Sequence, residues 1–283
     1  HLGAEQSKKP LSEAIPGETL NILLGSRPLG DDEDSDRVKM QVLKRLYDKY
    51  GITEADFASA ELETVPAVNA TDIGLDASLI GAYGHDDRVC GFAALQALLD
   101  IGTPEKTAVC VLADKEEIGS MGVTGMQSAA FDTFMNDLCD SQNVALRVCY
   151  ENAFCLSTDV TAAYDPNFSD VYEKRNASFL NHGVGLCKYT GARGKSGSSD
   201  ADAETVGYVR GVLDKAGIRW QICEMGKIDA GGGGTVAQFM ANRNITTLDA
   251  GVPVLSMHAP FEVVAKLDCY EMYRACKALY EAL

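Results

Sequence analysis

The feature that most constrains this chain is a short apolar run that ends in two adjacent carboxylates. Residues 108–113 read Ala-Val-Cys-Val-Leu-Ala, which predicts a buried strand. Glu116 and Glu117 follow almost at once, and Ile-Gly-Ser comes after them. Open α/β sheets place their chemistry where a strand runs into a turn, so both glutamates are candidates for a functional site. Standing alone, such a pair is more often a solvated surface loop.

Other polar residues occupy similar positions along the chain. Asp86 opens an apolar helical pattern, Asp159 follows an apolar stretch, and His258 comes just after residues 251–256, another predicted strand. Carboxylate and imidazole groups are suitable ligands for a hard or borderline metal ion. A lone histidine after a strand is more often structural, and an aspartate that opens a helix is often only its N-cap. The recurrence favours a metal site, and the spacing leaves open whether Asp86 or Asp87 is the ligand.

Strand and helix patterns alternate from residue 86 onward. Helices are predicted at 86–101, 122–138, 199–216 and 262–283, and strands at 108–113, 145–150, 183–189, 218–223 and 251–256. The alternation predicts an α/β fold with a mainly parallel central sheet and helices on both faces. A Gly-rich passage at 74–84 predicts a hinge, which divides the chain into residues 1–78 and a core of residues 79–283.

Composition excludes several classes of partner. The 283 residues are 46% hydrophobic, enough for a sizeable core, and the net charge of −16 argues against nucleic acid and anionic membranes as partners. The nine cysteines are an odd number without CxxC spacing, which favours buried free thiols and a cytoplasmic location. No stretch approaches the roughly 18 apolar residues of a membrane span.

The motifs resemble those of the aspartyl aminopeptidase and vacuolar aminopeptidase I family, which are peptidases with two zinc ions. The resemblance is carried by Asp86-Asp-Arg, Asp114-Lys-Glu-Glu-Ile-Gly-Ser, Ser157-x-Asp with Asp165-Pro-Asn, and Ser256-Met-His. The Gly-rich run at 231–234 and the segment 247–253 also fit, and the matches keep the family's order across most of residues 80–283. The resemblance implies a phosphorylase/hydrolase-like zinc peptidase core, with residues 1–78 as the later part of an inserted assembly domain.

The resemblance also implies a role for each candidate site residue. Asp86 would bridge two zinc ions, Asp159 would bind one of them, and Glu117 and His258 would bind the other. Cobalt or manganese would be substitute metals. Glu116 would act as general base and then as general acid, taking a proton from water and returning it to the leaving amine.

On the substrate side, the implied residues are Lys188, Lys195, Gly232, Gly233 and Met257. Solvated surface lysines are the plain alternative, and for Lys195 the two interpretations weigh about equally. The Gly-rich run lacks the context of a Walker or Rossmann motif, which favours a close backbone approach beside the substrate cleft.

Two departures from the family pattern qualify these expectations. The family carries its first metal-binding histidine in a His-x-Asp motif upstream of the inserted domain, and no such motif precedes that region here. The resemblance therefore implies that a segment of the core lies upstream of this sequence. In addition, Ala162 occupies the position at which members selective for acidic residues carry histidine. A preference for N-terminal Asp or Glu is therefore not implied.

The sequence thus predicts a zinc metalloaminopeptidase that removes the N-terminal residue from peptides and forms a closed homo-oligomer, as in the dodecameric shells of related enzymes. Two alternatives differ in class. One is another dinuclear zinc amidohydrolase, such as a deacylase of N-acyl amino acids. The other is a non-catalytic assembly relative that has lost its metal, against which the complete set of candidate ligands argues.

Overall fold

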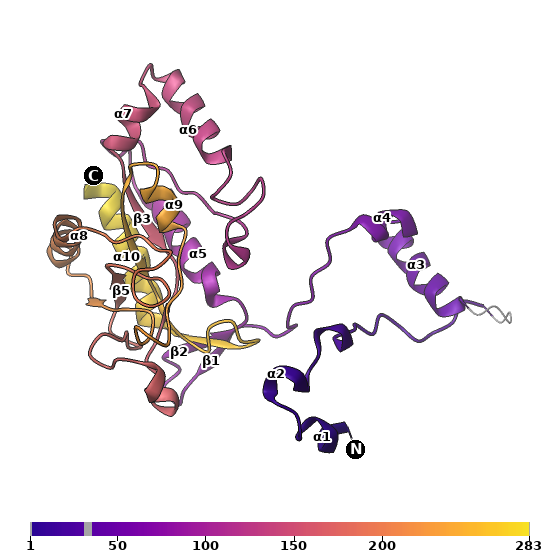
Figure 1. Cartoon of the computed structure of the whole chain (residues 1–283). Coiled ribbons are helices and arrows are strands. Elements are labelled where there is room, and N and C mark those ends of the chain that lie inside the picture. The colour runs from indigo at the N-terminus through magenta and orange to yellow at the C-terminus, as the bar shows by residue number, and fades with distance from the viewer. Residues whose placement is uncertain (1, 31–35, 283) are drawn as a thin grey trace. The chain divides into compact units, whose positions relative to one another are not determined.

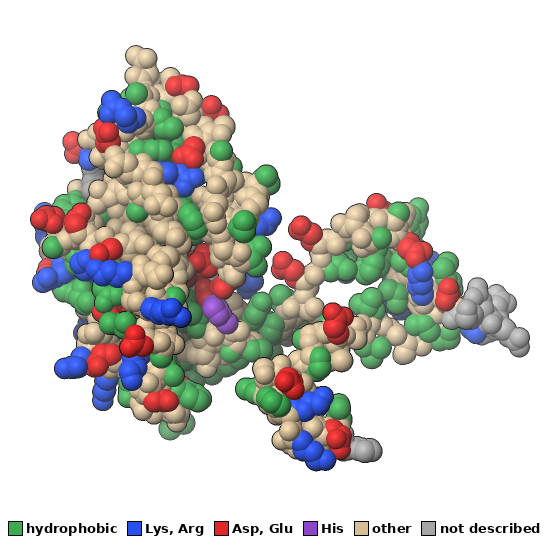
Figure 2. Space-filling view, viewed as in Figure 1, with side chains coloured by type: hydrophobic (Ala, Val, Ile, Leu, Met, Phe, Trp, Pro, Cys, Tyr) green, Lys and Arg blue, Asp and Glu red, His purple; other side chains and the backbone are tan. Residues whose placement is uncertain are grey.

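The computed structural model describes residues 2–30 and 36–282, and the chain divides into two compact units, His1–Thr64 and Val65–Leu283 (Figure 1). The first unit contains short helical segments: α1 (Leu2–Gln6), α2 (Leu11–Ala14), the 3-10 turn η1 (Gly17–Thr19), α3 (Arg37–Tyr50) and α4 (Glu54–Ser59). None of its described residues is buried, and hydrophobic side chains lie on its surface (Figure 2). Leu11 and Leu23, for example, are 89% and 88% exposed. The first unit therefore has no core of its own among these residues.

The second unit is built on two mixed sheets. One has the order β1 (Thr71–Ile73), β2 (Leu79–Ala82), β9 (Glu262–Ala265), β8 (Pro253–Leu255) and β4 (Thr161–Ala162). The other has the order β3 (Phe154–Thr158), β7 (Thr246–Gly251), β5 (Val184–Cys187) and β6 (Trp220–Ile222). The chain passes almost directly from β3 to β4 and from β7 to β8, so these two segments connect the sheets.

Helices cover both faces of the second sheet. Helices α5 (His85–Asp100), α8 (Ala203–Lys215) and α10 (Lys266–Ala282) share one buried apolar cluster with Leu248 and Ala250 of β7. Helices α6 (Ala130–Ser141), α7 (Leu146–Glu151) and α9 (Ala237–Ala241) meet in a second, smaller cluster, which Cys155 of β3 contacts. Alternate residues of a strand face opposite ways, which is why β3 contributes Phe154 and Leu156 to the first cluster and Cys155 to the second. None of the helices in the described parts of the chain has the length and apolar character needed to span a bilayer.

The α/β fold with helices on both faces is confirmed, and the described strands run in mixed directions. The pairs β3–β7, β4–β8 and β5–β6 are parallel, whereas β1–β2, β2–β9, β8–β9 and β5–β7 are antiparallel. In the sheet that the helices flank, two of the three described pairs are parallel, whereas three of the four pairs in the other sheet are antiparallel, so the mainly parallel sheet is confirmed only in part. The assignment of residues 1–78 to an inserted assembly domain stays a prediction.

Several predicted elements differ in the structure, among them the helix expected over 122–138, which begins only at Ala130. Residues 108–113 are extended but unpaired, since no described segment offers them a backbone partner. Of residues 145–150, predicted as a strand, all but the N-cap residue Ala145 lie in α7, where Arg147 forms an ion pair with Glu151, one helical turn further on. The predicted helix over 262–283 starts at Lys266, because the first four residues form β9 between β2 and β8.

Candidate metal centre

Sheet order brings the first pair of candidate ligands together. Strands β2 and β8 flank β9, and the chain leaves β2 toward Asp86 and leaves β8 toward His258. The Nε2 atom of His258 lies 3.0 Å from Oδ2 of Asp86 and 3.2 Å from Oε1 of Glu117. In Figure 2, acidic side chains gather beside a histidine on the face in view. Asp86, Glu117 and His258 can therefore offer ligand atoms to one metal ion, because these atoms all lie within 4.8 Å of one another.

A second group of potential ligands shares Asp86 with the first. It consists of Asp86, Asp87 and Asp159, whose carboxylate oxygens also lie within 4.8 Å of one another. Asp86 belongs to both groups, and a single carboxylate that serves two ions is the arrangement of two-metal hydrolases. Both Asp86 and Asp87 belong to this second group, and of the two only Asp86 also belongs to the first.

Asp159 occupies the crossover between β3 and β4, where two backbones come very close. Its carbonyl oxygen lies where a Cβ atom on Gly251 would be, only 1.5 Å away. The Asp159 N–H donates to the Ala250 carbonyl at 3.3 Å, which ties the crossover to β7. Glycine at residue 251 is required here by the close approach rather than by an unusual φ angle.

The two glutamates lie on the 3-10 turn η2 (Glu116–Ile118). Lys115 and Gly119, on either side, have φ angles of 64° and 93°, so the chain enters and leaves the turn in left-handed conformations. Successive side chains on a 3-10 turn point about a third of a revolution apart. Glu117 reaches His258 while Glu116 is half-buried, so the adjacent acids do occupy different environments.

The carboxylates are crowded and short of positive charge. Burial raises the pKa of Asp86 to about 6, of Asp87 to about 8 and of Asp159 to about 9, and neighbouring carboxylates add to each shift. Burial, Glu117 and Asp86 together raise the pKa of Glu116. Within residues 2–30 and 36–282, no lysine or arginine forms an ion pair with any of these acids.

This donor set fits zinc. Asp87 Oδ1 is buried without a hydrogen-bond partner in the described structure, which is expected of an oxygen that binds a cation. A bound cation removes the repulsion that otherwise favours protonated carboxylates. Aspartate, glutamate and histidine are zinc ligands, whereas calcium and magnesium prefer oxygen alone, so His258 favours zinc.

Sequence reasoning missed Glu262. This residue begins β9, is only 2% exposed, and accepts hydrogen bonds from the backbone N–H groups of Asp86 and His258. The segment Glu-Val-Val-Ala contains the signal, because two β-branched residues beside a glutamate are more typical of a strand than of a helix start. The long helical pattern that follows masked this signal.

The implied substrate-side residues do not join the acidic cluster. Lys188 and Lys195 both form ion pairs with Asp200. In the Gly-rich run, a Cβ atom on Gly232 would lie 1.9 Å from the Gly191 carbonyl oxygen, and Gly233 accepts a hydrogen bond from the Gly191 N–H. Met257 packs against the main apolar cluster. The close backbone approach at the glycines is observed, and its partner is the chain's own loop.

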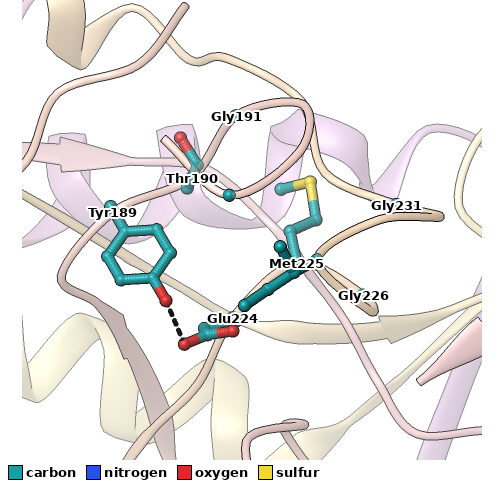
Figure 3. Close-up of a pocket in the computed structure, with 9 residues that line it drawn as sticks. Tyr189, Thr190, Gly191, Glu224, Met225, Gly226 and Gly231 are labelled. Carbon is teal, nitrogen blue, oxygen red and sulfur yellow. Dashed lines mark hydrogen bonds between the residues drawn. The ribbon is translucent and has the colours of Figure 1, made fainter. Parts of the chain in front are cut away.

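A small pocket lies between that loop and the Gly-rich run (Figure 3). Its volume is about 10 Å³, which suits one water molecule and not a side chain of a substrate. Tyr189 closes one side by donating a hydrogen bond to Glu224. A far larger cavity, of about 1150 Å³, adjoins the acidic cluster and is lined by Asp86, Glu117 and many apolar residues.

Comparison with known proteins identifies several relatives of this chain. Residues 1–280 match the family model of the aminopeptidase I zinc metalloproteases (M18). A probable M18 family aminopeptidase 1 of Clostridium acetobutylicum is 47% identical over 275 residues, which cover 96% of this chain and 59% of that protein. The crystal structure of an M18 family aminopeptidase from Thermotoga maritima superposes with a TM-score of 0.92 at 45% identity, covering 97% of this chain and 62% of that one.

A more distant likeness is to the structure of a dodecamer from Saccharomyces cerevisiae. It has a TM-score of 0.67 at 23% identity and covers 85% of this chain and 54% of that chain, which establishes similarity of fold. This chain spans about six tenths of the length of the bacterial relatives that it matches.

Proposed function

Because this chain belongs to the M18 family of aminopeptidase I zinc metalloproteases, we propose that it forms the metal centre of an aminopeptidase that removes N-terminal residues from peptides. The observation that carries the proposal is the position of Asp86 in both groups of potential ligands. Asp86 would bridge two zinc ions, with Glu117 and His258 on one and Asp159 on the other. Asp87, the buried neighbour, would contribute to the second ion, and cobalt or manganese would substitute for zinc.

Glu116 is the general base of the proposed reaction. Zinc ions at these positions would supply a polarised peptide carbonyl and a water that loses its proton near neutral pH. The Glu116 carboxylate takes that proton and then delivers it to the leaving amine. Its half-buried position beside Glu117 and Asp86 raises its pKa, which makes it a better proton acceptor than an exposed glutamate.

On the substrate side, we assign Lys188, Lys195, Met257 and the backbone at Gly232 and Gly233 to the walls of the peptide-binding region. Ala162 lies in β4, two residues after the crossover at Asp159 and Val160. A small apolar side chain there offers no hydrogen-bond donor to an acidic substrate. The favoured peptides are therefore expected to begin with residues other than Asp and Glu.

We also propose that the protein forms a closed homo-oligomer in the cytoplasm. A yeast protein of similar fold has been solved as a dodecamer. The exposed leucines of the first unit, among them Leu11 and Leu23, support a covering partner. A second copy of the chain is the simplest such partner. All nine cysteines are free, which agrees with a reducing compartment.

The proposal is tested by comparing substrate classes with and without metal. The zinc-loaded protein is expected to hydrolyse leucyl-anilides and alanyl-anilides and to leave N-acetyl amino acids intact. Removal of metal with a chelator is expected to stop hydrolysis, and added zinc is expected to restore it. Hydrolysis of N-acetyl amino acids in preference to anilides would instead identify a deacylase.

A further inference from the structure

Glu262 joins the two strand ends that present the candidate ligands. Its Oε2 atom accepts the Asp86 N–H at 3.0 Å, and its Oε1 atom accepts the His258 N–H at 2.7 Å. The two amides come from opposite flanks of β9, since β2 leads to Asp86 and β8 leads to His258. One buried carboxylate thus holds the backbone of two residues whose side chains meet at 3.0 Å.

The backbone at His258 needs such support. Ser256 and His258 have φ angles of 59° and 66°, in the left-handed region that side chains other than glycine rarely adopt. Conformations of this kind persist where surrounding contacts determine them, and they cluster at functional sites. The hydrogen bond from the His258 N–H to Glu262 is a contact of this kind, because it fixes the peptide group that precedes the His258 Cα atom.

We propose that Glu262 is a positioning residue, which holds Asp86 and His258 in the arrangement that binds metal without itself touching the ion or the substrate. The inference rests on the proposed metal centre. Groups that orient the ligands of a metal are generally needed for its full affinity, and their loss typically weakens binding by roughly 10-fold to 100-fold. Glu262 differs from the usual case because it acts on the ligands' backbone rather than on their side chains.

The protein contains a matched control in Asp268, on α10. Its carboxylate is fully buried and also accepts two backbone N–H groups, those of Asn181 and Gly183, at 2.8 Å and 2.7 Å. Neither of those residues is a candidate ligand. Glu262→Gln and Asp268→Asn therefore remove the same kind of interaction, one beside the metal centre and one away from it.

The experiment measures zinc affinity by competition with a chromophoric chelator, together with the visible spectrum of the cobalt-loaded protein and the thermal unfolding of the metal-free protein. Glu262→Gln is expected to weaken zinc binding by roughly 10-fold or more and to alter the cobalt spectrum. Asp268→Asn is expected to lower the unfolding temperature and to leave zinc affinity and the cobalt spectrum unchanged. Glu262→Asp, which keeps the charge but shortens the reach, should fall between wild type and Glu262→Gln.

The outcomes separate this inference from the proposed function. Wild-type zinc affinity in Glu262→Gln, or an equal loss in Asp268→Asn, would overturn the positioning role. If Glu262→Gln does not fold, Glu262→Asp decides, and wild-type affinity in that variant overturns the role. A wild-type protein that binds zinc but cleaves no peptide would refute the proposed function and leave the role of Glu262 intact. A wild-type protein that binds no zinc would overturn both.

Discussion

Two charged clusters in the second unit differ in how their charges are balanced. At Asp200, the carboxylate binds Lys188 and Lys195, and the two lysines lower its pKa. At Asp86, several carboxylates face one another, no lysine or arginine among the described residues pairs with them, and burial raises the pKa values of Asp86 and Asp159. The charges of the first cluster balance within the chain, whereas a bound cation would balance those of the second.

This difference is more informative than the number of acids. Surface ion pairs usually contribute little to stability, and their presence says little about function. Buried carboxylates that repel one another are costly, so a fold keeps them where a metal ion or a reaction uses them. The imbalance around Asp86 is thus the physical mark of the candidate site.

The largest effect is expected from replacing Asp86, the carboxylate that belongs to both groups of potential ligands. Asp86→Asn takes one carboxylate from both groups and is expected to abolish binding of at least one zinc ion. Loss of the metal's charge stabilisation, worth several kcal/mol, predicts a fall in kcat/KM of roughly 10³-fold or more. Elemental analysis and anilide hydrolysis measure the two effects. Full zinc content and normal turnover would remove Asp86 from the centre.

A substitution at Glu116 is expected to have the next largest effect. It separates the proposed role of Glu116 as a base from that of Glu117 as a ligand. Glu116→Gln should lower kcat by roughly 10²-fold to 10⁴-fold, because a neutral amide cannot accept the proton of the attacking water. Its metal content should stay at the wild-type level. The adjacent Glu117→Gln is the control, since it should lose zinc as well as turnover. Loss of zinc from Glu116→Gln would contradict the assignment of a base.

The sequence predicts the site better than the sheet. The positions of Asp86, Glu117 and His258 in separate motifs indicate a common site, and the structure brings the three side chains together. The strand at 108–113 fails because pairing depends on a neighbouring backbone, which a local apolar pattern does not report. The run at 145–150 fails because a short apolar segment has no period that separates a strand from a helix.

Glu262 shows why a site's supporting residues are harder to predict than its ligands. The ligand motifs are local, whereas the role of Glu262 depends on its position in a strand between β2 and β8. Strand order arises from contacts between distant segments. No local pattern therefore predicts which carboxylate will accept the backbone N–H groups of both Asp86 and His258. Spacing alone treats Asp87 as an alternative to Asp86, because it does not report that both carboxylates lie in one group.

A substitution at Gly251 that adds no charge tests whether the acidic cluster depends on backbone packing as well as on charge. In Gly251→Ala, the new Cβ atom would lie 1.5 Å from the Asp159 carbonyl oxygen, so the crossover must move. Overpacking of this kind is expected to cost on the order of 3 kcal/mol in the free energy of unfolding. Zinc affinity should fall too, because Asp159 moves with its backbone. Gly207→Ala, on the open surface of α8, is the control, and it should stabilise the fold by about 0.5–1 kcal/mol because alanine is the better helix former.

The smallest effect is expected at the cluster of Asp200 with Lys188 and Lys195, the balanced cluster. Lys188 and Lys195 are 40% and 55% exposed, so each ion pair with Asp200 should contribute less than about 1 kcal/mol to stability. If the lysines line the peptide-binding region, Lys188→Ala should raise KM a few-fold while kcat and zinc content stay unchanged, since uniform substrate binding is lost without loss of chemistry. Lys44→Ala, which breaks an exposed pair with Asp48 in the first unit, is the control for nonspecific charge effects. A collapse of kcat in Lys188→Ala would show that the balanced cluster takes part in the reaction, and unchanged kinetics would reduce both lysines to surface ion pairs.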